Sequence, residues 1–181
     1  MATSSTTELE LWETLAFEAA AESPLWSYSL RPTGERELIA VFSPLCDEVF
    51  ALGVETIYEG YLLHYGNPRL FDPADADTGL LLGDYLYAHG LVRIAATGSV
   101  EAVHDLAELI SLCAQARGDG RAGEPEAWAA TAVLLGQGLL EEARQELREH
   151  GNTASLLDLA RAAAGVEAVG RACVAHELRV R

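Results

Sequence analysis

Two glutamates stand four residues apart in the segment Glu55-Thr56-Ile57-Tyr58-Glu59, which the surrounding apolar pattern places on a helix. Residues four apart share a helix face, so the two carboxylates are neighbours. Glutamate can ligate Mg²⁺, which prefers carboxylate and phosphate oxygens. Such a pair is more often two solvated acids on an exposed face. The residues alone therefore predict an exposed acidic pair, with a Mg²⁺ site as the alternative.

The other residues that could do chemistry form no familiar site. The aspartates between Asp72 and Asp77 could hold Ca²⁺, but Pro73 and the missing bidentate Glu fit no EF-hand loop, so we expect a solvated turn. The five histidines lack HxxxH and HExxH spacing, and no GxSxG or Walker sequence occurs. Three distant cysteines without CxxC spacing indicate free thiols in a reducing cytoplasm, so a cytoplasmic protein is expected.

Charge and hydropathy exclude several classes of partner. The 181 residues carry a net charge of −16, and all twelve basic residues are Arg. Coating nucleic acid needs clustered cations, and anionic lipid attracts basic segments, so neither partner is expected. The N-terminus shows no signal peptide, and the longest apolar run, residues 129–136, is far shorter than the roughly 20 residues of a membrane span.

The elements that must position these residues are all predicted to be helices. The high Ala and Leu content favours helix, and alternation typical of strands never lasts. Thr7 and Glu10 form a predicted capping box for the first helix, and Ser43-Pro44 is typical of another helix start. The predicted helices cover residues 7–22, 35–43, 43–63, 80–97, 99–117, 125–136, 139–150, 154–164 and 166–179. We therefore expect a single all-α domain, an antiparallel helical bundle.

Three segments in register resemble the trans-isoprenyl (polyprenyl) diphosphate synthases. Gly83-Asp84-Tyr85-Leu86-Tyr87-Ala88 is similar to the G-D-Y-L-x-A helix of that family. Gly66-Asn67-Pro68 lies where the family has a G-x-P turn, and Arg31-Pro32 resembles the end of its G-G-K-R-x-R-P stretch. The resemblance covers residues 25–157, between an N-terminal helix at 7–22 and a C-terminal helix at 158–181. It implies a truncated isoprenoid-synthase fold.

The departures from the family concern its diphosphate and metal sites. Glu55 and Glu59 replace the first aspartate-rich motif, and His64-Tyr65 replaces a pair of arginines. The second aspartate-rich motif is reduced to the lone acid Asp158. The resemblance thus implies two sets of residues. The vestigial diphosphate region is Glu55, Glu59, His64 and Arg31; the product-tunnel or subunit-interface set is Phe50, Ala51, Tyr85 and Tyr87. Plain core packing is the alternative for Phe50 and the tyrosines.

The resemblance with these departures implies a non-catalytic small subunit, a pseudoenzyme of isoprenoid biosynthesis. It would pair with a catalytic polyprenyl diphosphate synthase that supplies Mg²⁺, and would influence activity or product chain length. One alternative is a homodimer that holds an isoprenoid or lipid. Another is a weak Mg²⁺-dependent prenyltransferase, for which Arg69, Arg93 or Arg117 would have to converge on one site. An unrelated helical scaffold ranks last, because no 34-residue repeat is present.

Overall fold

The computed structural model describes residues 3–180, and side chains from residue 9 onward. The described residues form nine α-helices, two short 3-10 helices and two isolated β-bridges, without a strand. The all-α class predicted from the sequence is confirmed. The helices are α1 (Thr3–Glu22), α2 (Pro24–Ser29), η1 (Thr33–Glu35), η2 (Ser43–Leu45), α3 (Glu48–Tyr65), α4 (Ala76–Ala96), α5 (Val100–Asp119), α6 (Glu124–Val133), α7 (Glu141–His150), α8 (Ala154–Ala164) and α9 (Val166–Glu177).

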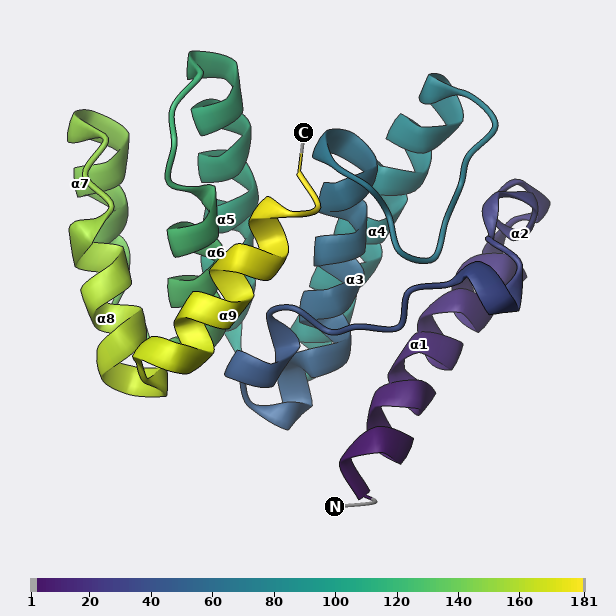
Figure 1. Ribbon diagram of the computed structural model, residues 1–181, viewed down its shortest axis with the longest axis horizontal. Coiled ribbons are helices and arrows are strands. Elements are labelled where there is room, and N and C mark those ends of the chain that lie inside the picture. Colours follow the sequence, from purple (N-terminus) through teal and green to yellow (C-terminus); the bar gives the residue numbers. More distant parts are fainter. Residues whose placement is uncertain (1–2, 181) are drawn as a thin grey trace.

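The helices are arranged around α3 (Figure 1). Helix α4 lies behind α3 in that view, α1 and α2 lie at one end of the molecule, and α7 and α8 lie at the other. Helix α9 runs from α8 across α6 toward α3. The end of the described chain meets the loop after α3, where Gly66 and Val180 form an antiparallel bridge. This bridge ties the C-terminal end of the described chain to the loop that follows α3.

Glycines allow α3 and α4 to lie unusually close. A Cβ atom on Gly60 would sit 2.9 Å from the backbone oxygen of Gly83 on the facing helix. A Cβ atom on Gly90 would sit 2.4 Å from Cγ1 of Ile57. Both distances are shorter than carbon and oxygen atoms tolerate, so a side chain at either position requires the helices to separate.

Two apolar clusters form the core. The larger one joins α3 to α5, α6, α8 and α9, and includes Phe42, Ile57, Leu109, Trp128 and Val169. The smaller one fastens α1 and the loop before α4 to α4 itself. Its buried members are Trp12, Leu15, Ala19, Leu70, Phe71, Leu82 and Leu86. Burial of this kind supplies most of the stability of packed helices.

The helix predicted over residues 35–43 is wrong. Only the turn Thr33–Glu35 is helical, and the following segment is extended until η2 begins at Ser43. The backbone nitrogen of Glu37 donates to the carbonyl of Arg69, and those of Val41 and Phe42 donate to the Glu55 carboxylate. These partners lie outside the segment, so tertiary contacts replace the hydrogen bonds that a helix would make.

Three helix starts also differ from the sequence prediction. Helix α1 begins at Thr3 rather than Thr7, since no Gly or Pro interrupts residues 3–6; the capping contact predicted at Thr7 lies outside the described side chains. The Ser43-Pro44 start yields only η2, because Cys46 and Asp47 are extended, and α3 begins at Glu48. Helix α4 begins at Ala76, where Asp75 Oδ1 accepts from the Thr78 nitrogen at 2.7 Å. The predicted acidic turn therefore contains a helix cap.

Candidate functional site

Glu55 and Glu59 lie on the inward face of α3 and are completely buried. The prediction of two solvated acids on an exposed face is therefore wrong. Burying an ionised carboxylate is unfavourable unless opposite charge and hydrogen bonds replace the lost water. The partners of these two side chains decide what the pair can do.

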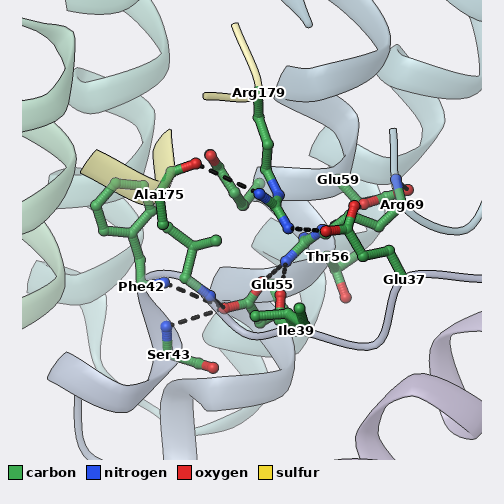
Figure 2. A network of polar contacts seen from close by, with 12 residues as sticks. Glu37, Ile39, Phe42, Ser43, Glu55, Thr56, Glu59, Arg69, Ala175 and Arg179 are labelled. Atoms are coloured by element: carbon green, nitrogen blue, oxygen red, sulfur yellow. Dashed lines mark hydrogen bonds and ion pairs between the residues drawn. The ribbon is translucent and has the colours of Figure 1, made fainter. Parts of the chain in front are cut away.

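The Glu55 carboxylate is held by one guanidinium and three backbone amides (Figure 2). Its Oε1 accepts from the nitrogens of Val41, Phe42 and Ser43 at 3.1, 3.3 and 3.0 Å. Its Oε2 accepts from Nη1 of Arg69 at 2.6 Å. The extended segment before η2 is thereby fastened to the middle of α3.

The Glu59 carboxylate is held by the next part of the chain. Its Oε1 accepts from the backbone nitrogens of Arg69 and Leu70, both at 2.7 Å, and its Oε2 accepts from Nε of Arg69 at 2.9 Å. Arg69 Nη1 also donates to the Ile39 carbonyl at 3.0 Å. One arginine therefore bridges both glutamates and the extended segment.

Aromatic rings enclose the Arg69 guanidinium. Its central carbon lies 4.5 Å from the ring centroid of Trp12 on α1 and 4.9 Å from that of Tyr58 on α3. Burial alone lowers the pKa of Arg69, but the carboxylates of Glu55 and Glu59 outweigh it and raise the pKa above its usual value. Arg69 therefore stays charged, and cation–π contacts tie α1 to the cluster.

The glutamate pair does not fit Mg²⁺. All four carboxylate oxygens accept hydrogen bonds from Arg69 or from backbone amides. Mg²⁺ needs near-octahedral oxygen ligands and usually keeps several waters, but these oxygens are dry and face a cation. Within the part of the chain whose side chains are described, no group of three or more His, Cys, Asp or Glu residues could hold a metal ion.

The interior next to this cluster is filled by rings. Phe42, Tyr58, Tyr61, Trp128 and His176 lie with centroids 5.0–6.1 Å apart in the contacting pairs. The Tyr58 hydroxyl lies 3.1 Å from Nδ1 of His176. Burial, with a smaller contribution from Arg117, lowers the pKa of His176 to about 4, so this imidazole is neutral near pH 7. The centre of the bundle is thus packed with side chains.

The other members of the predicted diphosphate region do not join the glutamates. Arg31 lies 3.7 Å from Asp72 near the surface. His64 lies 3.2 Å from Asp84 and stacks on Tyr87 at 5.1 Å between centroids. The structure brings Glu55 and Glu59 together through Arg69, and directs Arg31 and His64 to separate acids.

The predicted tunnel or interface residues also fall in different places. Phe50 is buried in the larger core cluster and Ala51 is half-buried. Tyr85 is half-buried between Trp26 and His89, with centroids 5.7 and 5.3 Å away, while Tyr87 contacts His64 on another side of α4. Core packing thus accounts for Phe50, whereas Tyr85 lies partly at the surface.

The three arginines considered for a converging cation set lie apart. Arg69 pairs with Glu55 and Glu59, Arg93 pairs with Glu18, and Arg117 donates to Glu124 at 2.7 Å. Each therefore meets its own acid rather than a shared anion site. The convergence that the prenyltransferase alternative requires is therefore not found, because these arginines pair with different carboxylates.

Sequence reasoning missed the central role of Arg69 and the ring cluster around His176. The sequence did contain a signal for Arg69. This residue follows the Gly66-Asn67-Pro68 turn, which reverses the chain and returns Arg69 to the helix that carries Glu55 and Glu59. No local pattern marks His176, because its hydrogen-bond partner, Tyr58, lies 118 residues earlier in the chain.

No described helix is both long enough and apolar enough to traverse a bilayer. Comparisons of the chain with models of protein families, with curated proteins and with solved structures found no match. The geometry of the chain itself must therefore carry the functional argument.

Proposed function

We propose that this chain is a non-catalytic subunit of a heteromeric polyprenyl diphosphate synthase, in which a catalytic homologue supplies the metal and the diphosphate sites. The observation that carries the proposal is the internal neutralisation of Glu55 and Glu59 by Arg69. These acids occupy the positions at which the resembled family holds Mg²⁺, and here they bind the protein's own cation.

The chemistry of the resembled family explains why a partner is needed. Ionising an allylic diphosphate requires fixed cations on the charge that develops. The chain contains no Lys, and Arg69 is buried, with its Nε and Nη1 bonded to Glu59, Glu55 and the Ile39 carbonyl. A lone chain of this kind lacks the charges that the reaction needs at the equivalent place.

The same observations make the two alternatives weaker. A homodimer that holds an isoprenoid needs an apolar cavity, whereas stacked rings fill the centre of this bundle. A weak Mg²⁺-dependent prenyltransferase needs free carboxylates, whereas those of Glu55 and Glu59 are engaged. The subunit proposal requires neither.

The test is a prenyltransferase assay with and without a partner. The purified chain is incubated with Mg²⁺, an allylic diphosphate and a labelled homoallylic diphosphate, and we expect no product. A motif-complete prenyl diphosphate synthase from the same source is then assayed alone, with the chain and with serum albumin. We expect a complex by light scattering and a changed rate or product length with the chain only. Turnover by the lone chain, or no complex and no change, contradicts the proposal.

A further inference from the structure

Helix α4 presents an apolar face that nothing in the described chain covers. Leu81, Asp84, Ala88, Val92 and Ala95 are spaced three, four, four and three residues apart, so they share one side of the helix. Leu81 is 57% exposed and Val92 is 65% exposed. The two lie about three helical turns apart with Ala88 between them. Exposed apolar residues aligned along one side of a helix mark an interaction surface more often than scattered ones do.

The opposite side of α4 is already used. Leu82, Leu86, Gly90 and Ile94 are buried against the rest of the bundle, and Gly90 touches α3. Tyr85 stacks with Trp26 of α2, and Arg93 pairs with Glu18 of α1. The α4 face therefore points away from the described chain, because its neighbours occupy the other sides.

Asp84 gives this face a specific charge. It is the only Asp or Glu between residues 78 and 95, and its side chain is 73% exposed. Within the described residues, the group at ion-pair distance from it is His64, 3.2 Å away. Burial lowers the pKa of His64 although Asp84 acts in the opposite direction, so the imidazole is neutral near pH 7. The carboxylate consequently has no formal countercharge there.

We propose that the α4 face binds a helix of a different chain, one that presents an apolar stripe interrupted by an Arg or Lys opposite Asp84. This inference rests on the proposed function and adds to it the docking surface and the charge of the partner. Covering Asp84 without a cation would bury an unpaired carboxylate, which is strongly unfavourable. Complementary charge also selects one partner over others.

A second copy of this chain does not meet that requirement. If two α4 helices pack antiparallel about Ala88, Asp84 of one faces Val92 of the other. If they pack about the region of Asp84, or in parallel, the two carboxylates approach each other. Each chain also carries a net charge of −16, which repels its own kind. A partner that is less acidic and carries a cation at the matching position satisfies both conditions.

The test uses the motif-complete synthase of the preceding section as the probe, with affinity measured by titration calorimetry. Leu81→Glu and Asp84→Lys alter the face, and Val174→Glu is the control, since Val174 is a comparably exposed apolar residue on α9. We expect Leu81→Glu and Asp84→Lys each to weaken binding at least about tenfold, because both place an unmatched charge in the contact. Val174→Glu should stay within about twofold, as substitutions outside an interface do.

Each outcome separates the inference from the proposed function. All variants must keep the wild-type circular dichroism spectrum and melting temperature. A complex that tolerates both Leu81→Glu and Asp84→Lys overturns the α4 face and leaves the subunit function standing. A lone wild-type chain that forms a dimer, broken by Leu81→Glu, overturns the choice of partner. Absence of any complex overturns the proposed function, and the inference with it.

Discussion

Arg69 determines what Glu55 and Glu59 can do. The two acids accept hydrogen bonds from its guanidinium and from five backbone nitrogens that belong to residues 41–43 and 69–70. These contacts hold two loops onto α3 and leave the carboxylates dry. A pair that could have bound a metal instead fastens the extended segment and the α3–α4 loop.

Removing Arg69 should therefore destabilise the fold severely. Arg69→Leu leaves two buried carboxylates without their cation, and we expect a loss of about 3–5 kcal/mol in the free energy of unfolding, measured by urea denaturation. The control is Arg171→Leu, which removes an exposed ion pair with Glu167 and should change stability little. Equal effects of the two substitutions would show that the buried cluster contributes no more than a surface pair.

His176 makes stability depend on pH in a predictable direction. Its pKa is about 4 in the folded chain, below the ordinary 6.5, so the unfolded chain binds the proton more readily. The contribution of neutral His176 to the free energy of unfolding is complete above pH 6.5 and is lost as the pH falls toward 4. At pH 5 the loss relative to pH 7.5 should be about 2 kcal/mol. His176→Gln, measured by urea denaturation at both pH values, should lose less on acidification than wild type does; an unchanged pH dependence would contradict the assignment.

At the scale of elements, several helix ends were predicted correctly from local signals, namely a capping serine, a proline in the first turn and a terminal glycine. Ser99 caps α5, accepting from the nitrogen of Ala102 at 3.1 Å, Pro125 lies in the first turn of α6, and Gly151 ends α7 in the left-handed conformation. The segment before η2 was predicted to be helical and is extended, because its hydrogen-bond partners are Glu55 and Arg69. Local propensity cannot register partners so distant in sequence.

The close approach of α3 and α4 yields a prediction for Gly60. Gly60→Ala places a Cβ 2.9 Å from the Gly83 backbone oxygen, which cannot move without shifting α4. We expect a destabilisation of about 1–3 kcal/mol, measured by thermal and urea unfolding. Gly118→Ala is the control: that glycine lies near the end of α5 with nothing within 4 Å of its added Cβ. It should be neutral or stabilising, since Ala favours helix; similar losses at both sites would contradict the steric argument.

At the scale of the whole molecule, the sequence located the acidic pair but not its surroundings. The spacing of Glu55 and Glu59 correctly placed them on one side of α3, but their burial depends on how residues 37–43 and 69–70 fold over that side. The same holds for α4: the sequence predicted a helix over residues 80–97, and only the packed structure distinguishes its buried side from the exposed Leu81 and Val92. Solvent exposure is a property of the assembled fold.

The large negative net charge of the molecule yields a prediction, which is tested at the acidic residues of helix α7. Glu142, Glu146 and Glu149 lie three or four residues apart, are exposed and line a surface groove between α7 and α8. Like charges at this spacing repel, and Glu146 and Glu149 lie toward the C-terminus of α7, where negative charge is unfavourable, whereas Glu142 lies in the first turn, where it is favourable. Replacing Glu146 and Glu149 by Gln changes the net charge from −16 to −14. At low salt we expect a gain of about 1 kcal/mol, or about 2–4 °C in the unfolding midpoint for a chain of this size. In 1 M KCl, where the Debye length is about 3 Å, the gain should largely vanish. Calorimetry at both salt concentrations measures the change in the unfolding midpoint. A gain that persists at 1 M KCl would arise from the altered side chains themselves. The excess negative charge would then not be what limits the stability of this chain.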